Sequence, residues 1–395
     1  MKQPFFSIVI PTKNRPELLR DAILSVLWQD FKDYELIVSD NFNDERTKKV
    51  VDEFVSDPRL RYFRTEKELN MPDHWEFASG KANGTYIFML TDRSLFRKGA
   101  LKRISDIIRT YVPKGVQAYG WQHAIFDIKG KFLRPVANPS RSVVVSFSRD
   151  LIREYARQEK VDWRFPLLPN ACYHRDVATL IRNKHGRMFF PIAPDITSEF
   201  LILSYTDKIA GIGEPLLLAQ TAENSNGAVC LAVGPEPYLN TLNLSNWYRY
   251  VPIKAPFISN LNFDVFLMVQ AMVHKEPLFA DVDWTTYFLK CYEEFVYFGI
   301  NGFIKNRKPE FFGAWKKALS SFDKKVQSRV KKEMFRTKLI FSAKAILANS
   351  PLLLSRFLRH LQGRLVYRSP VKYYSNALEA AGFDNNVVAS KMKNK

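Results

Sequence analysis

Three apolar stretches of this 395-residue sequence are each followed directly by polar side chains that could bind a ligand. "FFSIVI" precedes Pro11-Thr12, "ELIVS" precedes Asp40-Asn41, and "YIFML" precedes Thr91-Asp92. Short apolar, β-branched runs of this kind are typical of buried strands. In parallel α/β sheets, ligands bind beyond the carboxyl ends of the strands. The three polar groups are therefore candidates for one cleft.

Strands and helices alternate over the first ninety residues. The expected strands are 5–10, 34–41, 60–65 and 86–90, and the expected helices are 17–29, 45–55 and 74–82. Apolar residues recur at helical spacing in the first helix, and Pro11 is expected to end the first strand. This alternation predicts an α/β fold, a mostly parallel sheet flanked by helices.

The rest of the chain is less regular. We expect an α/β domain over 1–235, with a first half at 1–100 and a second half at 101–235. Residues 236–395 are helix-like, aromatic and basic. The charge of +19 is concentrated there, because 21 Lys and Arg face 5 Asp and Glu between residues 301 and 395. A basic surface should thus meet its partner through the C-terminal region.

Bulk properties exclude several classes of protein. A composition that is 46% hydrophobic excludes a disordered chain. Three scattered cysteines favour a reducing compartment, and their spacing argues against a zinc cluster. The N-terminal apolar run is too short for a signal peptide, and no stretch approaches the length of a spanning helix. The expected location is the cytoplasm.

Three segments together resemble family 2 glycosyltransferases, which are inverting, nucleotide-sugar-dependent enzymes with a Rossmann-like GT-A fold. "FSIVIPTKNRPELLRDAILSVLWQDFKDYELIVSDNFNDERT" is similar to the start of that family's domain. "GTYIFMLTDR" resembles the strand that delivers its DXD motif, and "HGRMFFPIAPDITSEFLI" the region of its catalytic base. The resemblance covers roughly residues 5–220.

The resemblance implies a nucleotide pocket after the strands. Its residues are Pro11, Thr12, Asn14, Arg15, Asp40, Asn41, Asp92 and Arg93. The carboxylate of Asp40 could accept the N3–H of uracil, and UDP is the family's commonest donor nucleotide. Structural alternatives stay open, since Asn14 and Asp40 could each cap the helix that follows.

The DXD motif, which holds Mg²⁺ or Mn²⁺ in the family, is degraded here. Asp92 is present, but its neighbours are Thr91, Arg93 and Ser94. Asp92 could still bind one cation whose other ligands are diphosphate and water. Alternatively, Arg93 could supply the positive charge, because guanidinium suits phosphate oxygens, or the two residues could merely pair with each other. We expect Asp92 to be the metal ligand.

An inverting transfer also needs a base for the acceptor hydroxyl. The resemblance points to Asp195, with Glu199 in reserve, although Asp195 could instead cap a helix. His74, Trp75 and Trp121 are candidates for contacts with the sugar or the acceptor, or else for core packing.

The basic segment 316–368 fits an amphipathic helix that could lie on an anionic membrane surface, or could form a lid or dimer element. No nucleic-acid-binding motif accompanies it, and the oligomeric state is not indicated.

The function predicted from the resemblance is transfer of a sugar, with inversion, from a nucleoside diphosphate sugar to a glycan or lipid-linked glycan in surface polysaccharide assembly. The alternative is a non-catalytic glycan- or membrane-binding protein on a decayed GT-A scaffold. Nucleotidyltransferases and dehydrogenases need a glycine-rich loop after the first strand, and "PTKNRPE" has no glycine.

Overall fold

The structure, a computed structural model, describes residues 3–42, 45–134, 136, 139–159, 162–221, 229–230, 234, 236–242, 248–273, 282–301, 308–335 and 372–384. The chain divides into two compact units. Unit 1 comprises residues 1–152, 161–222 and 371–395, and unit 2 comprises residues 153–160 and 223–370. Each is described by itself.

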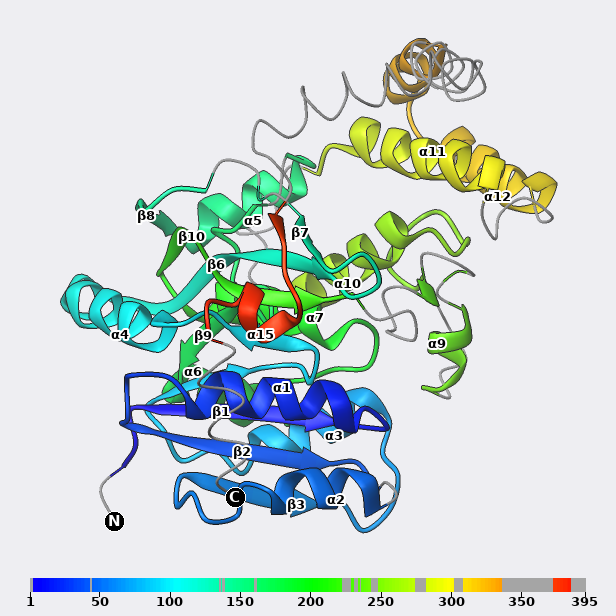
Figure 1. The fold of residues 1–395 in the computed structure, drawn as a ribbon. Coiled ribbons are helices and arrows are strands. Elements are labelled where there is room, and N and C mark those ends of the chain that lie inside the picture. The colour runs from blue at the N-terminus through cyan, green and yellow to red at the C-terminus, as the bar shows by residue number, and fades with distance from the viewer. Residues whose placement is uncertain are drawn as a thin grey trace. The chain divides into compact units, whose positions relative to one another are not determined.

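The described strands of unit 1 form one mixed sheet (Figure 1). Its hydrogen-bonded order is β11 (Lys372–Tyr373), β7 (Phe132–Arg134), β6 (Val116–Asp127), β9 (Ala171–His174), β4 (Tyr86–Met89), β1 (Phe6–Thr12), β2 (Tyr34–Asp40) and β3 (Leu60–Arg64). Off this path, β10 (Lys208–Gln220) pairs with β5 (Ser94–Phe96), β6 and β8 (Val143–Phe147). The strands from β4 to β3 are parallel, and β9 joins the two parts of the sheet in antiparallel pairing.

Pro11 does not end the first strand, contrary to the expectation from sequence. It lies within β1, opposite Ser39 of β2. Pairing between β1 and β4 extends only from Phe6 to Val9. The missing N–H of Pro11 is tolerated there because β1 has a ladder on one side only beyond Val9.

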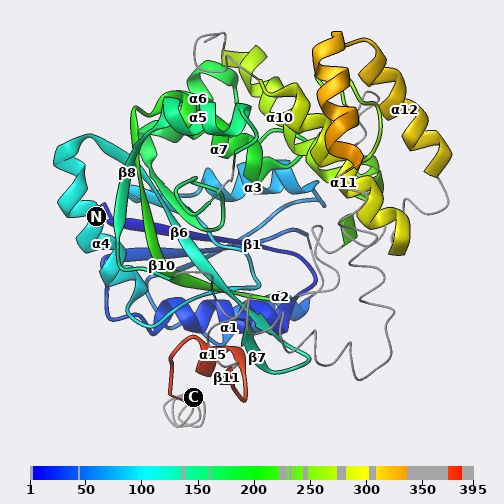
Figure 2. The ribbon, with the colours of Figure 1, turned by 90° about the horizontal axis from the view of Figure 1, so that it is seen from above.

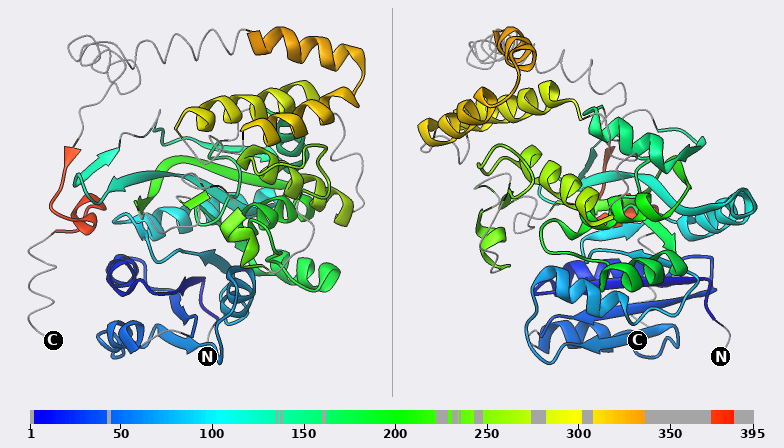
Figure 3. Two further views of the ribbon diagram at one scale, coloured as in Figure 1. Left: turned by 90° about the vertical axis from the view of Figure 1, so that its right-hand side faces the viewer. Right: turned by 180° about the vertical axis from the view of Figure 1, so that it is seen from behind.

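Helices cover both faces of the parallel half of the sheet, as predicted. α1 (Pro16–Leu27) and α2 (Glu45–Asp52) lie on one face, and α3 (Met71–Ser79) lies on the other (Figures 2 and 3). α1 buries Leu19, Ala22, Ile23 and Val26 against the sheet, where they join the main apolar core. Their burial removes apolar surface from water and stabilises this layer.

α3 begins three residues earlier than the sequence pattern predicts. The Asn70 side chain accepts the backbone N–H of Asp73 at 2.9 Å, and Pro72 occupies the first turn. Both residues are typical of a helix N-terminus, so the capping signal is a better guide to this boundary than the apolar spacing.

The other described elements of unit 1 extend or cover the sheet. They are α4 (Ala100–Tyr111), η1 (Val112–Lys114), α6 (Arg175–His185), α7 (Pro194–Tyr205), α15 (Ala377–Ala380) and the start of α5 (Ser148–Ala156). Residues 372–384, which were expected to belong to the C-terminal region, are part of unit 1 and pack against the rest of it. The backbone N–H of Lys98 donates to Ala381, and Phe383 contacts Trp28 edge-on at 5.8 Å.

Unit 2 is mainly helical among its described residues, as expected for the C-terminal region. It contains α9 (Glu236–Asn240), α10 (Ile258–Val273), α11 (Trp284–Asn301) and α12 (Lys308–Ser320). Aromatic rings hold these helices together, with Phe288 and Trp315 in edge-on contact at 5.9 Å.

Two expectations about this region remain predictions. The boundary at residue 235 and residues 336–368 of the basic segment 316–368 lie outside the described residues. Among the described residues, none of the helices is long and apolar enough to cross a membrane.

Candidate active site

The three strand ends singled out from sequence meet at one edge of the sheet. β1 lies between β2 and β4, and all three run in the same direction. Thr12 is the register partner of Asp40, and its hydroxyl donates to Oδ2 of Asp92 at 3.0 Å. The ends of β1, β2 and β4 therefore lie at one edge of the sheet, as the alternation of strands and helices in the sequence predicts.

Asp92 is the centre of this edge. It is buried, and in addition to the Thr12 bond its Oδ1 accepts Nη1 of Arg15 at 3.2 Å. Burial raises the pKa of the Asp92 carboxyl, while Arg15, Thr12 and Arg93 act in the opposite direction. Arg15 directly precedes α1 and follows Asn14. The φ of Asn14 is 57°, in the left-handed region, which asparagine adopts more readily than most other residues. The backbone turn at Asn14 thus leads the chain to the point where Arg15 pairs with Asp92.

Arg93 extends the site toward the other half of the sheet. Its Nη1 donates to the carbonyl of Gln220 at 3.1 Å, and the backbone N–H of Gln220 donates to the Arg93 carbonyl at 2.9 Å. Burial lowers the pKa of the half-buried Arg93, as does the neighbouring charge of Arg15, whereas Asp92 and Asp195 oppose this shift. Arg93 therefore lies within electrostatic reach of both acids.

Asp195 and Glu199 lie one turn apart on α7. Glu199 is buried, and its Oε1 has no hydrogen-bond partner among the described residues. Burial raises its pKa, and the charge of Asp195 raises it further. Burial also raises the pKa of the half-buried Asp195, while the N–H groups of Ile196 and of Asp195 itself, and then Arg93, act to lower it. Both carboxyls thus have a raised pKa, and Glu199 is the more deeply buried of the two.

The backbone before α7 is strained. Ile192 and Ala193 have φ values of 73° and 46°, in the left-handed region that non-glycine residues seldom occupy. The Thr197 hydroxyl donates to the carbonyls of Ile192 at 3.0 Å and Ala193 at 3.1 Å. Ala193 is the N-cap and makes no side-chain cap, so Asp195 at the second helical position is not the capping residue.

Asp40 and Asn41 form the far side of the edge. The Tyr62 hydroxyl donates to Oδ2 of buried Asp40 at 2.8 Å, and Nε of Arg64 is 4.0 Å from the same oxygen. The Asn41 amide exchanges two hydrogen bonds of 2.8 Å with the backbone of Leu69. Asn41 therefore ties the end of β2 to the loop before α3, while the Asp40 carboxylate is held by Tyr62.

The predicted sugar-contacting residues are all buried, so their ligand roles stay predictions. The His74 ring forms a 3.0 Å hydrogen bond with the Ser39 hydroxyl, and burial lowers its pKa to about 4. Trp75 packs edge-on against Phe189 at 5.5 Å. Trp121 packs on Phe88 in the core, with no hydrogen-bond partner for its ring N–H among the described residues.

The donors around Asp92 test whether a divalent cation fits there. Both carboxylate oxygens of Asp92 already accept hydrogen bonds, and two guanidinium groups act on it. The hydroxyls of Thr91 and Ser94 bond to each other at 2.7 Å. Among the residues that the structure describes, no group of three or more His, Cys, Asp or Glu could hold a metal. Mg²⁺ and Mn²⁺ need several oxygen ligands and are repelled by positive charge, so these side chains alone do not fit them. A cation that Asp92 holds together with diphosphate and water stays a prediction.

Sequence reasoning did not identify Gln220 or Thr197. Gln220 follows no motif and reaches the site because β10 ends beside the loop after β4; its buried Nε2 has no hydrogen-bond partner among the described residues. Thr197 lies in the segment that resembles the region of the catalytic base. Its role, a hydrogen bond to the strained turn at Ile192, is visible only in the structure.

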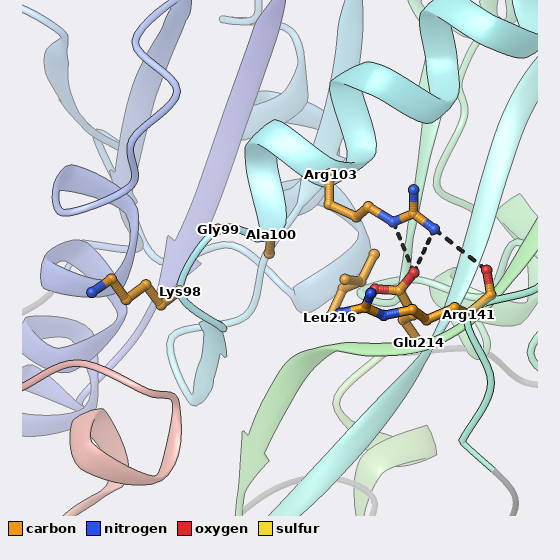
Figure 4. A pocket seen from close by; sticks show the side chains of 7 residues that line it. All are labelled: Lys98, Gly99, Ala100, Arg103, Arg141, Glu214 and Leu216. Carbon is orange, nitrogen blue, oxygen red and sulfur yellow. Dashed lines mark hydrogen bonds and ion pairs between the residues drawn. The ribbon is translucent and has the colours of Figure 1, made fainter.

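A separate hollow of about 480 Å³ contains none of these residues (Figure 4). Its lining comprises Lys98, Gly99, Ala100, Arg103, Arg141, Glu214 and Leu216. Arg103 is ion-paired with Glu214 at 2.6 Å, and this pair neutralises part of the positive charge of the hollow. The carboxylate in its lining, Glu214, is held in this ion pair.

The sheet order and the site after β1, β2 and β4 define a GT-A type of α/β fold. Residues 7–127 match the family model described as "Glycosyl transferase family 2". These residues are therefore similar to a family 2 glycosyltransferase domain, in agreement with the family predicted from the sequence.

Two curated relatives are similar over part of the chain. The GalNAc(5)-diNAcBac-PP-undecaprenol beta-1,3-glucosyltransferase of Campylobacter jejuni is 36% identical over 103 residues, 26% of this chain and 33% of that protein. An uncharacterized glycosyltransferase of Haemophilus influenzae is 24% identical over 143 residues, 36% of this chain and 56% of that protein. The chain therefore spans only about a third to just over half of the length of these relatives.

A solved structure supports the fold over most of the chain. The crystal structure of S. aureus TarS 1–349 in complex with UDP-GlcNAc is similar with a TM-score of 0.52, covering 82% of this chain and 83% of that one. The sequence identity is 15%, so the similarity establishes the fold alone.

Proposed function

We propose that this protein transfers a sugar, with inversion, from a nucleoside diphosphate sugar to a glycan or lipid-linked glycan acceptor. The observation that carries the proposal is a set of charged side chains: Asp40, Asp92 and Arg93 at one sheet edge, and Asp195 of α7, whose charge acts on Arg93. The donor would bind along the strand ends, and Asp195 would act on the acceptor.

UDP is the donor nucleotide that the proposal favours. A buried carboxylate at Asp40 suits the N3–H of uracil, and TarS, which shares the fold, is described in complex with UDP-GlcNAc. The lipid-linked acceptor follows the undecaprenol-linked substrate named for the C. jejuni relative. Surface polysaccharide assembly is the pathway that we propose for such an acceptor. An acceptor of that kind would bring the protein to the inner face of the membrane.

The reaction is a displacement at the anomeric carbon. The acceptor oxygen attacks that carbon from the face opposite the diphosphate, and a carboxylate on α7 takes the acceptor's proton. The bond from the anomeric carbon to the β-phosphate oxygen breaks, and its electron pair stays on the diphosphate. We assign the role of base to Asp195 because the charge of Arg93, a residue of the donor side, acts on its carboxyl, whereas Glu199 is more deeply buried.

The test is calorimetric titration of UDP, GDP, dTDP and CMP into the full chain. We expect one diphosphate to bind, and Asp40→Asn to weaken it by about tenfold or more, because a carboxylate accepts a stronger hydrogen bond than an amide. Asp52→Asn, at an exposed position on α2, is the matched control and should leave affinity unchanged.

Release of UDP from UDP-sugars then separates an enzyme from a non-catalytic binding protein on a decayed scaffold. Nucleotide binding without any turnover would favour that scaffold. Failure of every nucleotide to bind would overturn the proposal.

A further inference from the structure

Arg15 and Arg93 both act on the carboxylate of Asp92, and the charge of Asp195 also acts on Arg93. Arg15 is ion-paired with Asp92 at 3.2 Å, and the charge of Arg93 acts on Asp92 as well. The two guanidinium groups are close enough for Arg15 to affect the protonation of Arg93. Like charges held together in a partly buried place cost free energy unless an anion lies with them. An additional anionic group would therefore be stabilised here.

Arg93 has hydrogen-bond donors that could bind such an anionic group. Its backbone and one N–H of Nη1 are fixed by Gln220. The remaining N–H groups of its guanidinium make no hydrogen bond to any residue that the structure describes. A guanidinium has several donors in a planar fork that matches phosphate oxygens, so one fixed donor leaves others for a diphosphate.

A glycosyl transfer of the proposed kind needs positive charge at this point. As the bond to the anomeric carbon breaks, negative charge grows on the departing diphosphate, and groups that neutralise it speed the reaction. The guanidinium groups that act on Asp92 already supply positive charge there and repel a divalent cation.

We infer that Arg93, supported by Arg15, neutralises the departing diphosphate and that transfer at this site proceeds without a divalent cation. The inference rests on the proposed function and refines it. In the step, the electron pair of the broken bond stays on the diphosphate oxygen, and Arg93 donates hydrogen bonds to the diphosphate. Asp92 keeps the two arginines together and is not a metal ligand.

The experiment measures binding of the nucleoside diphosphate, UDP in the first instance, and donor turnover in EDTA and in Mn²⁺. We expect the same Kd and the same initial rate under both conditions. Arg93→Gln should weaken UDP about 10- to 100-fold in both, as expected for lost hydrogen bonds to a charged group, and leave the affinity for uridine unchanged. Arg93→Lys keeps the charge but not the fork, and should lie between.

Arg149→Gln, at an exposed position on α5, is the matched control and should behave like the native protein. UDP binding or turnover that requires Mn²⁺ would overturn the inference and leave the proposed function standing. No binding of any nucleotide under either condition would overturn both. The comparison of EDTA with Mn²⁺ uses the native chain, so it decides the question even if an Arg93 variant does not fold.

Discussion

The Thr12 hydroxyl donates a hydrogen bond of 3.0 Å to Oδ2 of Asp92, joining the ends of β1 and β4 across 80 residues of sequence. Both side chains are buried. Through this bond, the end of the first strand fixes the acid around which Arg15 and Arg93 gather.

Thr12→Val tests that bond. Valine has the shape of threonine but leaves a buried carboxylate oxygen without its donor, which should lower the free energy of unfolding by about 1–3 kcal/mol. Urea denaturation measures the change. Thr47→Val is the control, because the buried Thr47 hydroxyl has no hydrogen-bond partner among the described residues. Equal destabilisation by both substitutions would show that the Thr12 bond contributes nothing specific.

Asp195→Asn tests the assignment of the base. Removing a general base typically costs about 10²–10⁴ in rate, so we expect kcat to fall by that factor while the Kd of UDP stays unchanged. Glu199→Gln should have a much smaller effect on kcat. Steady-state kinetics with titration of UDP separates the two readouts. A larger loss of kcat in Glu199→Gln than in Asp195→Asn would transfer the role to Glu199.

Thr197→Val tests the strained turn that positions Asp195. Loss of the hydroxyl bonds to the carbonyls of Ile192 and Ala193 should destabilise the protein by about 1–2 kcal/mol. Because the turn fixes the start of α7, kcat should also fall while UDP affinity is kept. Thr197→Ser retains the hydroxyl and should recover most of both; if serine behaves like valine, the hydroxyl is not what holds the turn.

His74 gives a prediction about acid stability. Its folded pKa is about 4 because it is buried, whereas an unfolded histidine titrates near 6.5. Between these values the unfolded chain binds more protons, so stability falls as the pH falls. Between pH 7.5 and pH 5 this should amount to about 2 kcal/mol.

His74→Gln removes that titration and can still hydrogen-bond to Ser39. Unfolding free energies measured from pH 7.5 to pH 5 should therefore fall less steeply in the variant than in the native protein. Buried acids titrate in both proteins and cancel in the comparison. Parallel curves would mean that His74 does not titrate as the structure indicates.

Sequence reasoning predicted the parallel half of the sheet well because local signals specify it. Apolar runs, amphipathic spacing and polar strand ends all lie within the first hundred residues, and the strands pair in the expected direction. Boundaries were less accurate where one local signal competed with another. At α3 the Asn70 cap and Pro72 override the apolar spacing, and at β1 the one-sided pairing tolerates Pro11.

The second half of the site could not be predicted in the same way. The contact between Arg93 and Gln220 spans 127 residues, and no periodicity in the sequence encodes it. The left-handed backbone at Ile192 and Ala193 is equally hidden, because neither residue is a type that favours such φ values. The ion pair between Asp92 and Arg15 is also evident only in the folded structure, because the sequence does not show that Arg15 lies next to this acid.

A crystal structure of the protein with UDP in the presence of EDTA tests the central claim most directly. The account predicts uracil beside Asp40 and the diphosphate on the guanidinium groups of Arg15 and Arg93, with Asp195 left open for an acceptor. UDP bound elsewhere, for example in the hollow at Lys98 and Arg141, would contradict it.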